Sequence, residues 1–183
     1  MTWFDEYLKR YQNSIYEENM IDKLQIIKSL WESARKKNKK VIFAGNGGSA
    51  ALSSHCSVDL TKNARVRAVN FNESDLITCF ANDYGYENWL AKAVEFYGDA
   101  NDVVVLTSSS GQSKNMVNAA KISKKMGLSV VTLTGFKEDN PLKKLGDVNL
   151  WVDSSAYNII EMTHHIWLLA VVDSIIGTAE YSA

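Results

Sequence analysis

Residues 41–60 read VIFAGNGGSAALSSHCSVDL: an apolar run, then three glycines within four residues, then a serine that opens a predicted helix. The apolar run is too short to be a helix by the length criterion, so it predicts a strand. Glycine lets backbone N–H groups come close to a ligand, and the N-terminus of a following helix adds unpaired donors and partial positive charge. This unit therefore predicts part of an anion-binding site.

Four further short runs of β-branched character predict strands: VRAVNF (66–71), DVVVLT (102–107), SVVTLT (129–134) and VNLWV (148–152). Helices are predicted between and after them, at 49–62, 73–80, 86–97, 113–126 and 157–176. Such alternation is typical of a parallel sheet with helices on both faces. The sequence therefore predicts an α/β fold, in which ligands bind outside the carboxyl ends of the strands.

Two helices are predicted ahead of the first strand, at about 3–18 and at 21–37. The earlier one carries an apolar stripe at i, i+4 spacing, made of Trp3, Tyr7, Tyr11 and Ile15. Such a stripe usually packs against something, for instance another subunit. Because there is one Pro and no internal repeat, we expect a single domain over 1–183, with N-terminal helices over 1–38 and an α/β core over 39–183.

The composition excludes several classes of protein. The chain has 183 residues, 46% of them hydrophobic and 22% charged, as in an ordinary globular domain. A formal net charge of -1 provides no electrostatic footprint for nucleic acid or an anionic membrane. Cys56 and Cys79 lack metal-type spacing and are expected to be buried free thiols. With no signal pattern at the N-terminus, we expect a cytoplasmic protein.

A second turn, TSSSGQS (107–113), follows another predicted strand and precedes a helix. Its serine hydroxyls can donate hydrogen bonds, so with the helix N-terminus it predicts a phosphate cradle; the alternative is that Ser110 or Ser113 merely caps the helix. GNGGSA matches a dinucleotide fingerprint weakly, because asparagines follow the next strand instead of an acid, and no Lys-Ser or Lys-Thr pair makes a Walker loop. The interpretation that remains is a site for a small phosphorylated ligand, held mainly by neutral hydrogen-bond donors.

In combination, GNGGSA, a helix with a His and an acid one turn apart, ANDYGYE (81–87), SSSGQS and VVTLTG (130–135) resemble the sugar isomerase (SIS) domains of the phosphoheptose isomerase group. The resemblance covers nearly the whole chain. It implies a flavodoxin-like three-layer α/β sandwich with a five-stranded parallel sheet. It also implies a homotetramer with sites between subunits, where sedoheptulose 7-phosphate becomes D-glycero-D-manno-heptose 7-phosphate.

The resemblance assigns roles position by position. The positions that match substrate-binding elements of the family are Asn46, Gly47, Gly48, Ser49, Asn82, Asp83, Ser108, Ser109, Ser110 and Ser113. The catalytic set that it implies is Asp59, Glu161 and His164. Two positions depart from the family: Asp59 stands where Glu is usual, and Leu169 stands where the last helix usually has a later histidine.

Sugar isomerisation goes most simply through an enediol, with a base for the carbon proton and an acid–base group for the oxygens. A carboxylate and an imidazole are the natural pair at neutral pH, and Asp59 is the positional candidate for the base. His55 precedes Asp59 by four residues, as Glu161 precedes His165, so each pair shares a helix face. No cofactor is expected to be required; the alternative is that these two pairs gather a divalent metal, with zinc the candidate.

Three functions compete at this point. The first is an active phosphosugar isomerase, with the missing histidine replaced by His164, by His165 or by a residue of another subunit. The second is a phosphosugar-binding regulator that has lost turnover, which Leu169 favours. The third is a structural or partner-binding tetramer in which the N-terminal helices matter most, which the presence of both GNGGS and SSSGQS disfavours. We expect the isomerase.

Overall fold

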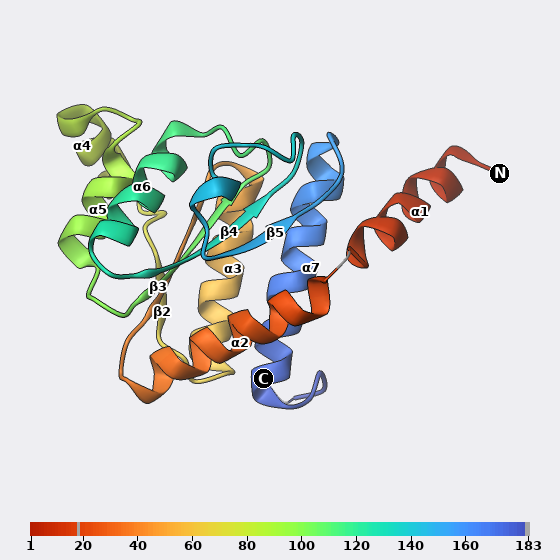
Figure 1. The fold of residues 1–183 in the computed structure, drawn as a ribbon, viewed down its shortest axis with the longest axis horizontal. Helices are drawn as coiled ribbons and strands as arrows, with labels where there is room; N and C mark the ends of the chain where they lie inside the picture. Colours follow the sequence, from red (N-terminus) through yellow and green to blue (C-terminus); the bar gives the residue numbers. More distant parts are fainter. Residues whose placement is uncertain (18, 182–183) are drawn as a thin grey trace.

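The computed structural model describes residues 1–17 and 19–181 and shows a five-stranded parallel sheet between two layers of helices (Figure 1). The strand order is β2-β1-β3-β4-β5, and every pair of neighbours is parallel. The strands are β1 (Val41–Gly45), β2 (Ala68–Asn70), β3 (Val103–Ser108), β4 (Ser129–Thr134) and β5 (Val148–Trp151). The predicted α/β fold with five parallel strands is confirmed.

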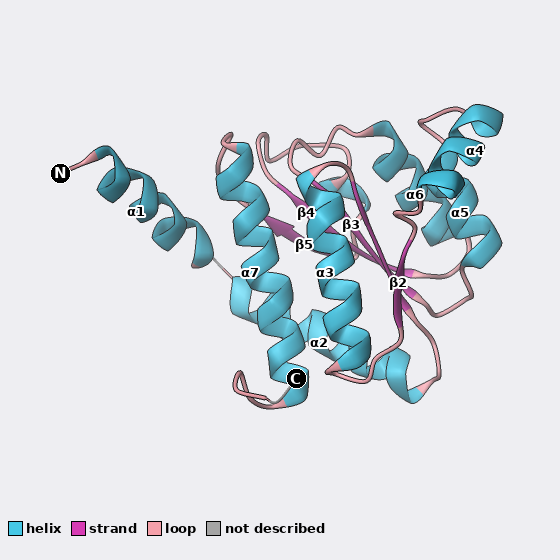
Figure 2. Ribbon diagram, turned by 180° about the vertical axis from the view of Figure 1, so that it is seen from behind, coloured by secondary structure: helices cyan, strands magenta, loops and turns pink. Residues whose placement is uncertain are grey.

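The helices fall into two groups, one on each face of the sheet. One face is covered by α2 (Met20–Lys36), α3 (Gly48–Lys62) and α7 (Tyr157–Ile176), and the other by α4 (Ser74–Tyr84), α5 (Trp89–Tyr97) and α6 (Lys114–Lys125). Figure 2 shows α3 and α7 running side by side on their face. Both faces of the sheet are buried because each carries a row of apolar side chains from the same strands.

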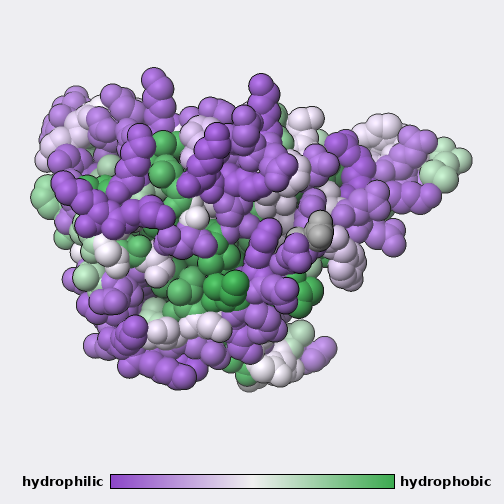
Figure 3. Space-filling view, viewed as in Figure 1, coloured by the Kyte–Doolittle hydropathy of each residue, from purple (hydrophilic) through white to green (hydrophobic). Residues whose placement is uncertain are grey.

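The remaining long helix, α1 (Trp3–Ile15), extends away from the body of the molecule (Figure 1). Its C-terminal end is tied to α7, because Nε1 of Trp167 donates to the carbonyl of Ile15 at 2.9 Å. At the free end of α1, which has a pale green tip in Figure 3, Trp3, Phe4 and Leu8 are between 61% and 69% exposed. The predicted stripe is therefore divided: Trp3 is exposed, whereas its other members are half-buried.

The last helix, α7, is 20 residues long and is apolar enough, by length and composition, to cross a membrane. Of its most apolar window, 44% is buried inside the fold. Trp167 and Leu168 are buried on its inner side, in the same core as α2, α3 and the sheet. Packing in the core thus accounts for part of this apolar composition, while Met162 and Ile166 of α7 are each 42% exposed.

Several local expectations differ from the structure. The predicted helix over 73–80 continues to Tyr84 and ends at Gly85, whose φ of +82° suits glycine. The strand expected over 66–71 is three residues long. The predicted helix over 3–18 ends at Ile15, and residue 18 lies outside the described residues. Of the two cysteines, Cys56 is buried as expected but Cys79 is exposed, because it lies on the outer side of α4.

The strand order determines where the two glycine- and serine-rich turns meet. β1 and β3 are neighbours, and Gly45 lies opposite Thr107 in their register. From β1 the chain moves to one side of the sheet, and from β3 it moves to the other. In a doubly wound sheet with this order, the crevice between the two strand ends is the usual ligand site. The turns after β1 and β3 both open into it.

Candidate active site

A small pocket of about 130 Å³ lies at the carboxyl ends of β1 and β3. It is lined by Asn46, Ser49, Thr107, Ser108, Ser109, Ser110, Ser113, Tyr157 and Glu161. The structure thus brings together most of the predicted substrate-binding residues, from two turns that lie about 60 residues apart in sequence. Sequence reasoning had missed Thr107 and Tyr157, which no local motif singles out.

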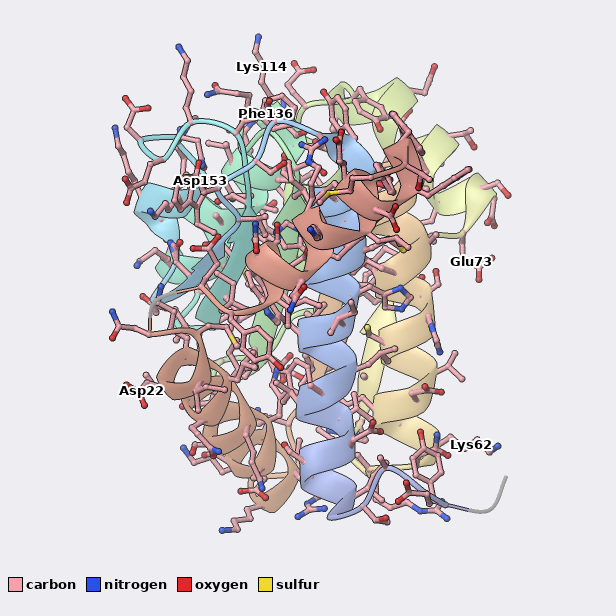
Figure 4. The ribbon with its side chains drawn as sticks, turned by 90° about the vertical axis from the view of Figure 1, so that its right-hand side faces the viewer. Asp22, Lys62, Glu73, Lys114, Phe136 and Asp153 are labelled. Atoms are coloured by element: carbon pink, nitrogen blue, oxygen red, sulfur yellow. The ribbon has the colours of Figure 1, made fainter. Side chains whose placement is uncertain are left out.

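The serine turn after β3 presents hydroxyl groups to this pocket. Ser108 Oγ donates to Ser113 Oγ at 3.0 Å, and Ser110 Oγ accepts from the backbone N–H of Gln112 at 3.2 Å. Ser113 occupies the N-cap position of α6, but its side chain makes no capping hydrogen bond. A purely capping role for Ser113 therefore does not describe the turn. The next residue, Lys114, projects outward from the top of the molecule (Figure 4), so the hydrogen-bond donors that line the pocket are neutral.

The glycine turn after β1 leaves room for a carboxylate. Gly47 has a φ of +56°, which an L side chain rarely adopts, and a Cβ on Gly48 would collide with the carboxylate of Glu161. Glu161 Oε1 accepts a hydrogen bond from Ser109 Oγ at 3.4 Å. The start of α3 therefore lies directly against Glu161 of α7, where the helix N-terminus favours negative charge.

Asn82 and Asp83, which were predicted to bind substrate, do not reach the pocket within one chain. Asn82 and Asp83 are exposed on α4, where Asn82 Nδ2 donates to Asp83 Oδ1 at 2.9 Å. The contact from this segment comes from Tyr86, whose hydroxyl donates to Asn46 Oδ1 at 3.2 Å. Within one chain, α4 continues through Asn82 and Asp83 and leaves both side chains exposed, so their part in substrate binding stays a prediction.

The catalytic assignment of His164 is wrong. His164 is fully buried, and its Nε2–H donates to the carbonyl of Thr134 at 3.0 Å. Burial lowers its pKa to about 4, against the opposing effect of that hydrogen bond. A neutral imidazole enclosed in the core reaches no ligand. The sequence could not show this, because neighbouring residues of a helix point about 100° apart and only packing decides which one faces inward.

The adjacent His165 faces the other way and joins the predicted pair of His55 and Asp59. His165 Nε2 lies 2.9 Å from His55 Nδ1, and His55 Nε2 lies 3.1 Å from Asp59 Oδ2. A carboxylate only accepts, so His55 carries its proton on Nε2 and accepts on Nδ1. His165 then donates from Nε2, which leaves a lone pair on its Nδ1. Burial, followed by the neighbouring His55, lowers the pKa of His165 and favours this neutral form, while Asp59 opposes the shift.

The position of Asp59 corrects another expectation. Asp59 was the expected base, yet it is not among the residues that line the serine pocket. It lies eleven residues beyond Gly48 on α3, which is roughly 16 Å along the helix. Within one chain, Asp59 can influence a ligand at the serine pocket only indirectly, through its contact with His55 and the contact of His55 with His165. It does not touch the serine pocket.

The four residues of the alternative metal site do not assemble as ligands. In the part of the chain that the structure describes, no three His, Cys, Asp or Glu side chains converge as metal ligands. His55 uses both ring nitrogens on Asp59 and His165, while Glu161 is directed towards Ser109. A zinc ion therefore does not fit this arrangement, and no chemical step is assigned to one.

A larger groove, of about 630 Å³, lies between α1 and the loops that follow β4 and β5. Figure 4 shows Phe136 and Asp153 on these loops, beside α1. Its lining residues are Arg10, Asn13, Ser14, Phe136, Lys137, Asp153, Ser154 and Ser155. This groove includes neither the turn after β1 nor the turn after β3, so it lies away from the switch point of the sheet. The smaller serine pocket, with Glu161 inside it, is the better candidate despite its size.

The sheet order and the serine pocket together define the chain as a doubly wound α/β domain that can hold a small anionic ligand at its switch point. The family model described as the SIS domain matches residues 3–135. The chain therefore belongs to the SIS domain family, as its motifs had indicated.

Two curated relatives carry the name phosphoheptose isomerase. The chain is 34% identical over 160 residues to the phosphoheptose isomerase of Sulfurimonas denitrificans, covering 84% of this chain and 82% of that protein. It is 31% identical over 175 residues to the phosphoheptose isomerase of Campylobacter concisus, covering 92% of each. Among solved structures, phosphoheptose isomerase GmhA from Neisseria gonorrhoeae matches with a TM-score of 0.85 and 28% identity, over 94% of each chain.

Proposed function

We propose that this chain is a phosphoheptose isomerase, which interconverts sedoheptulose 7-phosphate and D-glycero-D-manno-heptose 7-phosphate. The observation that carries the proposal is the pocket in which the serine turn after β3 faces Glu161 at the switch point of the sheet. The names of the curated relatives support the same substrate. The proposed proton transfers use side chains alone, so we propose that no cofactor is required.

The pocket suits the phosphate end of such a ligand. Hydroxyl donors at a helix N-terminus form charge-assisted hydrogen bonds to phosphate oxygens. Among the residues that line the pocket, Glu161 alone is acidic, and none is basic. Its carboxylate can accept hydrogen bonds from sugar hydroxyls once the phosphate lies among Ser108, Ser110 and Ser113. The sugar then extends from the pocket past Glu161.

The reacting carbons lie at the opposite end of the sugar from the phosphate. His165 follows Glu161 by one helical turn, roughly 6 Å farther along α7. We assign the proton transfer to the bare Nδ1 of His165. It takes a proton from C1 of the ketose while O2 gains one, which forms the enediol. Return of the proton to C2 and loss of the proton from O1 complete the aldose, so atoms and electrons balance.

The proposed assembly is a homotetramer with sites between subunits. A pocket of about 130 Å³ is smaller than the roughly 300 Å³ at which ligand sites usually begin, and the His55–His165 pair lies partly in the open. A second copy would close the site. The exposed Trp3, Phe4 and Leu8 of α1 provide an apolar surface suited to such a contact.

We expect light scattering at micromolar concentration to report four times the mass of one chain. The variant with Phe4→Asp and Leu8→Asp should dissociate, because burying two new carboxylates costs more than the contact gains. Glu6→Lys, on the other side of α1, is the matched control and should remain tetrameric. A folded wild-type protein that is monomeric under these conditions would contradict the assembly.

The function itself is tested by incubating the wild-type protein with sedoheptulose 7-phosphate in deuterated water. We expect NMR spectroscopy to show the aldose, with deuterium at C2, because proton transfer passes through an enediol. One observation favours the regulator instead: Leu169 packs against the core and supplies no imidazole. Binding of the sugar phosphate without any deuterium exchange would therefore support a non-catalytic phosphosugar-binding protein.

A further inference from the structure

Two asparagines, Asn46 and Asn115, form a pair beside the serine pocket. Asn115 lies in the first turn of α6 and is 2% exposed. Its Nδ2 donates to Asn46 Oδ1 at 2.9 Å, and Asn46 Nδ2 donates to Asn115 Oδ1 at 3.1 Å. The two amides thus form a closed, reciprocal pair between the turn after β1 and the start of α6.

The hydrogen bonds of the Asn46 side chain determine how its amide is oriented. A primary amide has two N–H donors and two acceptor lone pairs on its oxygen. Asn46 Oδ1 accepts from Asn115 and from the Tyr86 hydroxyl, while one N–H of Asn46 is used on Asn115. Turning the Asn46 amide over would place donor against donor in the pair. One N–H of Asn46 is left without a partner among the described residues.

That remaining donor belongs to a residue that lines the pocket. Asn46 is only partly buried and shares the pocket with Ser108 and Ser110, whereas Asn115 is enclosed behind it. No Lys or Arg lines the pocket, so each neutral donor contributes appreciably to holding an anion. An amide that could rotate freely would offer its oxygen, an acceptor, to the same ligand for part of the time.

We propose that Asn115 is a positioning residue, which holds the Asn46 amide so that its free N–H, and not its oxygen, faces the bound ligand. That the ligand is a sugar phosphate rests on the proposed function, but the amide pair itself does not. Asn115 touches no ligand. Its effect should therefore appear in binding more than in the rate of the bound complex.

The test uses Asn115→Asp, because a carboxyl group can imitate the amide in one protonation state only. A protonated carboxyl donates to Asn46 Oδ1 and accepts from Asn46 Nδ2, which reproduces the pair. An ionised carboxylate accepts from Asn46 but leaves Asn46 Oδ1 without that donor. Burial raises the pKa of a carboxyl group, so the two forms should be separable between pH 5.5 and pH 8, roughly.

We expect the KM of Asn115→Asp for sedoheptulose 7-phosphate to exceed that of the wild type by about tenfold near pH 8, the effect of one hydrogen bond. Near pH 5.5 the ratio should return to about one, with kcat little changed at either pH. Asn115→Ala should keep its raised KM throughout. Glu161 and Tyr157, which line the pocket, and Tyr86 are the same in each protein, so ratios taken at equal pH isolate the new carboxyl.

Asn149→Asp is the matched control. Asn149 lies on the edge strand β5, and its amide donates to the carbonyl of Lys143, away from the pocket. The KM of the Asn149→Asp protein should equal that of the wild type at both pH values. A KM ratio for Asn115→Asp that is the same at both pH values would overturn the positioning role, even if the enzyme is active.

A second measurement remains decisive if the wild type has no isomerase activity, which would refute the proposed function alone. In the free protein, the Asn46 side-chain proton bonded to Asn115 should resonate downfield of its partner in a ¹⁵N-correlated NMR spectrum. Asn115→Ala should remove this separation, whereas Asn115→Asp should keep it at either pH, because both forms of the carboxyl group accept from Asn46 Nδ2. Identical Asn46 signals in the wild type and in Asn115→Ala would refute the positioning role of Asn115 directly.

Discussion

Replacing Asp59 by Asn should reduce C2 deuterium exchange by roughly a hundredfold to ten-thousandfold, although Asp59 lies outside the serine pocket. The reason is the chain of contacts from Asp59 through His55 to His165. An asparagine amide can donate its N–H to His55 Nε2, which moves the proton of His55 to Nδ1. His165 must then accept on Nε2 and carry its proton on Nδ1, so it is no longer a base.

Both parts of this prediction can be measured. Exchange is followed in deuterated water with sedoheptulose 7-phosphate, and ¹⁵N chemical shifts of the two imidazole rings report the tautomers. Asp59→Glu is the matched control, since it keeps a carboxylate and restores the residue usual in the family; it should retain both exchange and tautomers. Unchanged exchange in Asp59→Asn, with the sugar phosphate still bound, would show that the chain through His55 has no catalytic role.

Replacing Ser108 and Ser110 together by Ala should weaken sugar phosphate binding by a hundredfold or more. Each charge-assisted hydrogen bond contributes roughly 1.5–3 kcal/mol, and no basic residue lines the pocket to compensate. A thermal-shift titration with the sugar phosphate, repeated with inorganic phosphate, measures the loss. The second probe separates the phosphate from the sugar, because the serines should affect both ligands equally.

Ser129→Ala is the control for the serine variant. Ser129 begins β4 at the amino-end edge of the sheet, opposite the pocket. Its affinity for both ligands should equal that of the wild type. If the double variant binds as tightly as the wild type and melts at the same temperature, the phosphate is held elsewhere and the groove beside α1 becomes the alternative.

Much of the fold could be predicted because its signals are local. The run at 41–45 is apolar and brief, while 114–125 has helical periodicity, and each forms the predicted element. The meeting of the two turns was also predictable, since parallel strands bring their carboxyl ends to one edge. Asn115 could have been noticed as a polar residue in the first turn of a helix that starts there. Nothing local marks it as buried.

The sequence alone determined the α/β class, the strand–turn–helix units and the residue types at the switch point, because these depend on periodicity and on a few neighbouring residues. Tertiary structure alone decided which chemistry those residues can perform. His55 and His165 are 110 positions apart and meet only because α3 and α7 pack side by side. The same packing turns His164 into the core and His165 out of it, since two successive side chains on a helix cannot share one face.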